Sequence, residues 1–146
     1  ARTHAVGEVS EETKKLIQVT KECFFEGIKY AKAGNHLFDI SGAIGRYAEE
    51  RGYGVVRDLC GHGIGTALHE APEIPNYEVG RKGVKLRPGM TLAIEPMINI
   101  GTYEVDWLDD DWTVVTRDGS LSAHYENTIL ITEGEPRILS LTCDNE

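Results

Sequence analysis

The sequence predicts an α+β fold in which two amphipathic helices pack on an antiparallel β-sheet. Apolar residues recur at helical spacing in the first third of the chain, whereas from Gly54 onward they form short runs separated by Gly, Pro and Asp. Helices that come first and strands that come later are typical of α+β proteins rather than alternating α/β proteins.

The first helix is predicted over residues 10–33. Ser10 is a suitable N-cap, and Glu11 and Glu12 complement the positive end of the helix dipole. Gly34 is expected to end the helix. One face carries a stripe of apolar and small residues, namely Leu16, Thr20, Cys23, Phe24, Gly27 and Ala31.

The second helix is predicted over residues 37–51, with Gly52 as the residue that ends it. Its apolar residues at helical spacing are Leu37, Ile40, Ile44, Tyr47 and Ala48.

The remaining segments predict strands. Asp118 and Gly119 form a strong turn signal between residues 112–116 and 124–132, which favours antiparallel pairing there. The apolar or alternating runs are residues 55–56, 90–100, 112–116, 124–132 and 137–141.

Composition indicates one domain over residues 1–146, because 40% apolar and 27% charged residues are typical of a globular chain of this length. The formal charge of −9 opposes binding to nucleic acids and anionic membranes and favours cationic ligands such as metal ions and peptide amino termini. No apolar run is long enough to span a bilayer. Cys23, Cys60 and Cys143 are odd in number and widely spaced, which favours a reducing cytoplasmic setting over a disulfide framework.

Two histidines occur in a glycine-rich segment. His62 lies between two glycines in GHGIG, where the absence of Cβ atoms lets the backbone approach a ligand, and His69 follows in ALHEAP. Two ordinary loop histidines are the alternative interpretation.

Two glutamates occur in apolar, strand-like runs. Glu95 lies in TLAIEPMINI, and Glu126 shares one face with His124 and Thr128 under strand alternation. A buried carboxylate needs a cation, so each glutamate predicts either a metal or a salt bridge to Arg or Lys.

His62, Glu95 and Glu126 are far apart in the sequence and converge only if a sheet brings them together. One imidazole with two carboxylates suits divalent Mn, Fe, Co or Zn, and such an ion supports hydrolysis. A structural module without metal is the alternative. Trp107 and Trp112 flank an acidic run, and each is expected either to line an apolar pocket or to belong to the core.

Four motifs in order, GHGIG, LRPGMTLAIEPM, DWTVVTRDGSLSAHYENTILIT and RILS, resemble the type I methionine aminopeptidases over nearly the whole chain. The creatinase and prolidase relatives share GHGIG and the EP element but differ in the segment before the last glutamate. The resemblance implies half of a pita-bread fold and removal of an N-terminal methionine from nascent peptides by a two-metal site.

Carried over by position, the resemblance gives the metal ligands as His62, Glu95 and Glu126. It implies proton transfer by Glu95 and contact with the scissile peptide by His69. Cys60, Leu68 and Trp112 match positions around the methionine pocket.

The family's two metal-binding aspartates belong to an N-terminal half, and ARTHAVGE aligns shortly after the second of them. We therefore expect one metal here rather than two. The alternatives are an enzyme completed by an N-terminal half, and a non-catalytic half that binds one metal and associates with that half or with itself.

Overall fold

The computed structural model describes residues 1–141, so Cys143 lies outside the described residues. Within these described residues, two helices precede ten short strands. The helices are α1 (Glu11–Ile28) and α2 (Leu37–Glu49), and the strands are β1 (Gly54–Val55), β2 (Gly61–Gly63), β3 (Glu70–Ile74), β4 (Thr91–Ile94), β5 (Met97–Asn99), β6 (Val105–Trp107), β7 (Val114–Thr116), β8 (Ser122–His124), β9 (Asn127–Leu130) and β10 (Arg137–Ile138).

The helices follow the predicted stripes, but α1 ends earlier than residue 33. The Ser10 side chain accepts a hydrogen bond from the backbone N–H of Thr13, as an N-cap does. After Ile28 the chain tightens into turns, and Gly34 at φ 95° donates its N–H to the Leu86 carbonyl. That contact ties the helix connection to a distant loop, which a continuous helix would prevent.

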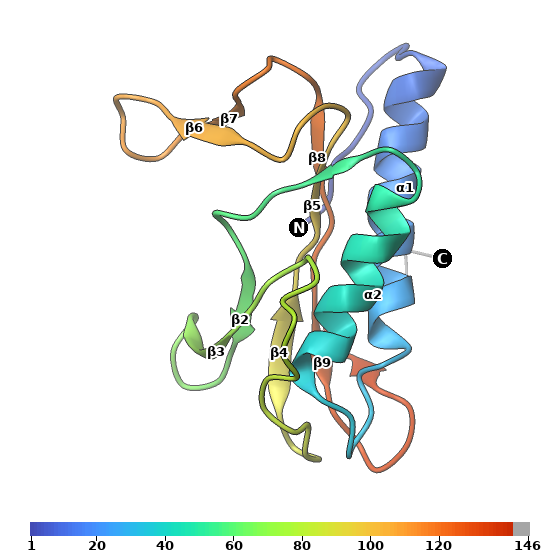
Figure 1. Ribbon diagram of the computed structural model, residues 1–146, viewed down its shortest axis with the longest axis vertical. Helices are drawn as coiled ribbons and strands as arrows, with labels where there is room; N and C mark the ends of the chain where they lie inside the picture. The colour runs from blue at the N-terminus through green and yellow to red at the C-terminus, as the bar shows by residue number, and fades with distance from the viewer. Residues whose placement is uncertain (142–146) are drawn as a thin grey trace.

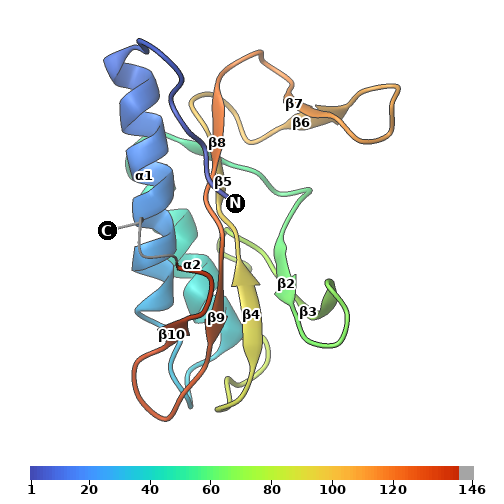
Figure 2. The ribbon, with the colours of Figure 1, turned by 180° about the vertical axis from the view of Figure 1, so that it is seen from behind.

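All strand pairs are antiparallel, and the helices lie together on one side of them (Figure 1). One sheet has the strand order β10-β9-β4-β2-β3, a second has the order β1-β5-β8, and β6 pairs with β7. The β6–β7 hairpin projects away from the rest of the molecule, as both ribbon views show (Figure 2). The predicted α+β class is confirmed.

The two long predicted strands are each interrupted at a glutamate. The run 90–100 divides into β4 and β5 at Glu95-Pro96, and the run 124–132 divides into β8 and β9 at Tyr125-Glu126. Because β4 pairs with β9 and β5 pairs with β8, the two interruptions lie side by side. The N–H of Tyr125 donates to the carbonyl of Pro96 across this junction.

The pairing predicted across Asp118-Gly119 is wrong. Gly119 does turn at φ 73°, but β7 pairs with β6 while β8 pairs with β5. The Asp118 carboxylate accepts hydrogen bonds from the N–H groups of Thr102 and Ser120, which fixes this turn against another loop rather than closing a hairpin.

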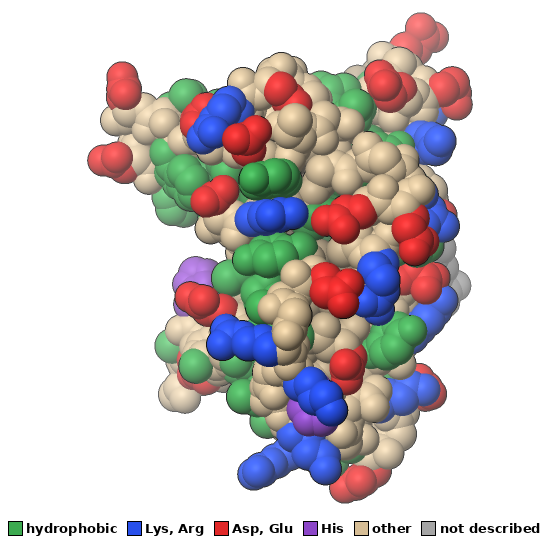
Figure 3. Space-filling view, in the orientation of Figure 1, with side chains coloured by type: hydrophobic (Ala, Val, Ile, Leu, Met, Phe, Trp, Pro, Cys, Tyr) green, Lys and Arg blue, Asp and Glu red, His purple; other side chains and the backbone are tan. Residues whose placement is uncertain are grey.

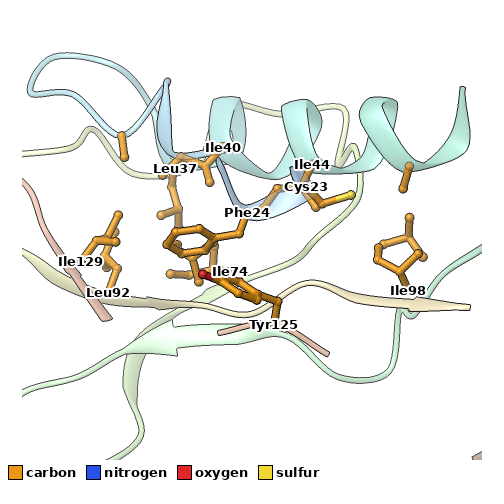
Figure 4. Packing of buried hydrophobic residues seen from close by; sticks show 14 of the residues in the cluster. Cys23, Phe24, Leu37, Ile40, Ile44, Ile74, Leu92, Ile98, Tyr125 and Ile129 are labelled. Carbon is orange, nitrogen blue, oxygen red and sulfur yellow. The ribbon is translucent and has the colours of Figure 1, made fainter. Parts of the chain in front are cut away.

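The core lies between the helices and the sheets. Phe24 of α1 is fully buried, and its ring lies 5.4 Å from that of Tyr125, the residue before Glu126 (Figure 4). No helix among residues 1–141 is long and apolar enough to cross a membrane. Other buried residues shown in the close-up are Cys23, Leu37, Ile40, Ile44, Ile74, Leu92, Ile98 and Ile129.

Candidate metal centre

His62, Glu95 and Glu126 converge at the junction between the sheets. Each offers one ligand atom, and these atoms lie within 4.8 Å of one another. β2 pairs with β4 so that His62 lies opposite Ala93, two residues before Glu95, and the adjacent strand interruption supplies Glu126. The convergence expected from the sequence is therefore produced by strand pairing.

The hydrogen bond at His62 Nδ1 determines what the other ring nitrogen can do. Nδ1 lies 2.8 Å from the carbonyl oxygen of Gly63, which accepts only, so Nδ1 carries a proton. In the neutral ring, the lone pair then lies on Nε2, which is 3.3 Å from Glu95 Oε1. An imidazole oriented by a hydrogen bond at its other nitrogen is the usual arrangement of a metal-binding histidine.

The Glu95 carboxylate is buried without a strong cation. Its side chain is 13% exposed, and its Oε1 atom has no hydrogen-bond partner. Burial first, and then the charge of Glu126, raises the pKa of Glu95 to about 7. Among residues 1–141 its ion-pair partners are His62 and His124, so the alternative of a salt bridge to Arg or Lys is not found.

Glu126 is more exposed, with 28% of its side chain accessible, and its Oε2 lies 3.2 Å from the amino group of Ala1. It too has no Arg or Lys partner among the described residues.

Two further residues support Glu95, and neither was singled out as a site residue from the sequence. Asn76 is buried and donates its side-chain amide to the backbone carbonyl of Glu95 at 3.1 Å. His124 places Nε2 3.6 Å from Glu95 Oε2, and burial lowers the pKa of this histidine. For His124 the sequence does contain a signal, because strand alternation places it on the same face as Glu126. The sequence contains no pattern that indicates a role for Asn76.

A hollow of about 580 Å³ opens beside the ligand group. The His69 ring lies 4.4 Å from the His62 ring, is exposed, and lines the hollow rather than the core. Cys60 also lines this hollow, and burial raises the pKa of its thiol. The Glu70 carboxylate accepts the N–H of Ala67 and so braces the loop that carries His69.

The other two residues matched to a methionine pocket lie on exposed segments. Leu68 is 67% exposed on the loop between β2 and β3. Trp112 is 87% exposed between β6 and β7, and Trp107 is 47% exposed, so the interpretation of these tryptophans as core residues is wrong. They project from a hairpin that is rich in acidic side chains (Figure 3).

The donor set fits a divalent cation of the borderline type. It combines a neutral imidazole nitrogen with two carboxylates, one of which has a buried and unpartnered oxygen. Such an ion offers chemistry that protein side chains alone do not: it acidifies water and polarises carbonyl groups.

Comparison with known proteins gives consistent matches. The sequence model of metallopeptidase family M24 matches residues 1–133. The methionine aminopeptidase of Clostridium acetobutylicum is 60% identical over 141 residues, which are 97% of this chain and 56% of that protein. The methionine aminopeptidase of Clostridium perfringens is 57% identical to this chain. The match covers 97% of this chain and 57% of that protein.

Solved structures agree. The methionine aminopeptidase from Thermotoga maritima superposes with a TM-score of 0.93 at 49% identity, covering 97% of this chain and 57% of the other. The prolidase from Pyrococcus horikoshii gives a TM-score of 0.73 at 26% identity, over 97% of this chain and 35% of the other. The chain spans about half the length of the curated relatives it matches.

Proposed function

The chain belongs to metallopeptidase family M24, and on that premise we propose that it serves to remove the N-terminal methionine from peptides and nascent proteins by metal-dependent hydrolysis. The single observation that carries the proposal is the convergence of His62, Glu95 and Glu126 within 4.8 Å at a junction built by strand pairing. Its helices and antiparallel sheets form half of the pita-bread fold of its solved relatives. A nascent protein as substrate puts the activity in the cytoplasm.

In this proposal His62 Nε2 and the carboxylates of Glu95 and Glu126 hold one divalent ion, either Co, Mn, Fe or Zn. A bound ion of this kind supplies a water of lowered pKa and a Lewis acid for the peptide carbonyl. The contact between His62 Nδ1 and the Gly63 carbonyl supports this assignment because it leaves Nε2 as the ring nitrogen that faces the two carboxylates.

The remaining roles fall to residues beside the ligands. Glu95 accepts and returns a proton at its carboxylate, because the position of that group at the ligand cluster brings it next to the reacting water. His69 donates to the scissile peptide from the wall of the hollow. Cys60, Leu68 and Trp112 contact the methionine side chain, and an apolar thioether suits such neighbours.

A second candidate function is single-metal binding without hydrolysis. The observation in its favour is that the described residues supply three ligands and that the ligand group is open to solvent at Glu126. In this case the chain associates with a complementary half, or with a second copy of itself, before it hydrolyses peptides.

The experiment measures release of methionine from a Met-Ala-Ser peptide by the purified chain with Mn or Co, beside the variant Glu126→Ala. Metal-dependent release that is lost in the variant supports the hydrolase. Calorimetric binding of Mn without release supports the second candidate. Absence of both would overturn the metal centre itself.

A complementation arm tests the partner. The part of the Clostridium acetobutylicum relative that this chain does not match is added to the purified chain, and methionine release is measured again. Release that appears only in the mixture identifies the partner as a complementary half. A dimer of the chain alone by light scattering supports self-association, whereas a monomer contradicts it.

A further inference from the structure

The Glu95 carboxylate lies between two imidazole rings. Its Oε1 atom is 3.3 Å from His62 Nε2, and its Oε2 atom is 3.6 Å from His124 Nε2. The Nε2 atom of His124 is buried and has no hydrogen-bond partner. A buried polar nitrogen without a partner is costly, and the carboxylate oxygen of Glu95 at 3.6 Å is the group placed to satisfy it.

The backbone of His124 is held by strand pairing and hydrogen bonds, so the side of the sheet that this residue faces is a property of the fold. His124 lies in β8 opposite Met97 of β5, two residues beyond Glu95. Its N–H donates to the Thr3 hydroxyl, and its carbonyl accepts from the Thr3 N–H. Tyr125, the next residue, is buried against the helix side of the sheet. Ala123, the preceding residue within β8, is also buried in the core, and successive residues of a strand face opposite sides, so His124 faces the side of Glu95.

His124 does not belong to the group whose ligand atoms lie within 4.8 Å of one another, which is His62, Glu95 and Glu126. A direct ligand would be expected inside that group. A residue outside the ligand group that lies beside one ligand instead resembles the hydrogen-bond partners that orient metal-binding carboxylates.

We propose that His124 is a positioning residue that donates its Nε2 proton to Glu95 Oε2 and thereby directs Glu95 Oε1 toward an ion shared with His62 and Glu126. This inference rests on the proposed metal centre. The separation of 3.6 Å is beyond a normal hydrogen bond, so this donation would require a small rotation of the Glu95 carboxylate toward His124.

The test compares two substitutions at this position. His124→Gln keeps an N–H donor near the place of Nε2, whereas His124→Leu keeps comparable bulk without a donor. Affinity for Mn²⁺ is measured by calorimetry, and the ligand field of bound Co²⁺ is measured by visible absorption. His4→Leu, at an exposed position, is the matched control for loss of a histidine.

We expect His124→Leu to weaken Mn²⁺ binding by about 10- to 100-fold, the usual effect of losing an outer partner of a ligand. His124→Gln is expected to restore most of that affinity with an unchanged Co²⁺ spectrum. Thermal unfolding of the metal-free variants shows whether each one folds, and the Gln variant keeps the test valid if the Leu variant does not.

Different failures have different meanings. Affinity in His124→Leu equal to that of the unmodified chain overturns the positioning role and leaves the metal centre intact. A changed Co²⁺ spectrum in His124→Gln overturns it as well, because His124 is then a ligand. An unmodified chain that binds neither ion overturns the proposed function along with the inference.

Discussion

The Nε2 atom of His62 faces the Oε1 atom of Glu95 across 3.3 Å, and the His62 proton is held on the opposite side of the ring by Gly63. Two electron-rich atoms at this distance require a cation between them. In the metal-free chain, burial first and then the charge of Glu126 raise the pKa of the Glu95 carboxyl to about 7, which favours a proton on this carboxyl.

The first prediction concerns the stability of the metal-free chain against pH. The folded chain binds the Glu95 proton more tightly than the unfolded chain, whose glutamates titrate near 4.5. The resulting stabilisation is complete below about pH 4.5 and is lost as the pH rises through about 7, a change of about 3 kcal/mol. Urea unfolding in EDTA between pH 5 and 8 measures it.

Glu95→Gln is the control for this effect, because the amide does not titrate. As the pH rises from 5 to 8, the free energy of unfolding of the unmodified chain should fall relative to that of the Glu95→Gln variant. Parallel pH profiles for the two proteins would contradict the assignment.

The second prediction concerns Glu126. Glu126→Gln removes a negative charge from the ligand group with little change of shape, so Mn²⁺ affinity should fall by more than the roughly 100-fold that loss of an outer partner can cost. Glu133→Gln, which neutralises an exposed carboxylate outside the ligand group, should leave the affinity unchanged. Calorimetry measures both. Equal losses in the two variants would mean that net charge, and not ligation, controls binding.

Helical periodicity could be read from the sequence because it is local, and the buried face of α1 contains Leu16 and Phe24 as expected. The strand β2 could not be predicted in this way. Residues Gly61–Gly63 carry almost no side-chain pattern, and their strand conformation comes from pairing with β3 and β4, which are distant in the sequence.

The sequence predicted those site residues that carry a charged side chain within an apolar, strand-like run. Glu95 stood out because apolar neighbours surround it, and the structure brings it together with His62 and Glu126. Trp112 carried a misleading signal, because tryptophan in a Thr/Val-rich segment is typical of a core strand. Its exposure follows from the projecting hairpin, a tertiary arrangement that no local pattern encodes.

The third prediction concerns the glycines around His62. A Cβ atom added at Gly61 would collide with the carbonyl oxygen of Ala93 on the neighbouring strand. Gly61→Ala should therefore push β2 away from β4, lower the free energy of unfolding by about 1 to 3 kcal/mol and weaken Mn²⁺ binding through His62. Gly134→Ala, where a Cβ meets nothing within 4 Å, is the matched control. If both variants unfold at the same urea concentration, the inference that β2 and β4 are too close at Gly61 to admit a Cβ atom is wrong.

The fourth prediction separates the two tryptophans from the core. Trp112→Ala should change the free energy of unfolding by no more than about 0.5 kcal/mol, because 87% of this side chain is already exposed. Trp107→Ala, at 47% exposure, should cost more. Urea unfolding measures both, and a large loss in the Trp112 variant would show that the hairpin packs on the body of the molecule.

The last prediction connects the helix core to the metal centre. Phe24 is fully buried, and its ring contacts Tyr125, which immediately precedes Glu126. Phe24→Ala should lower the free energy of unfolding by about 3 to 5 kcal/mol, because it removes a large apolar side chain and leaves a cavity.

Phe25→Ala is the matched control, since Phe25 is only partly buried although its ring also lies 6.1 Å from that of Tyr125. Phe25→Ala should lower the free energy of unfolding by clearly less than Phe24→Ala does, because solvent already reaches part of the Phe25 side chain. Where both variants are still folded, Mn²⁺ affinity should fall further in the Phe24 variant, because Tyr125 can then move into the cavity and carry Glu126 with it. Full metal affinity in a folded Phe24 variant would show that strand pairing alone holds Glu126 in place.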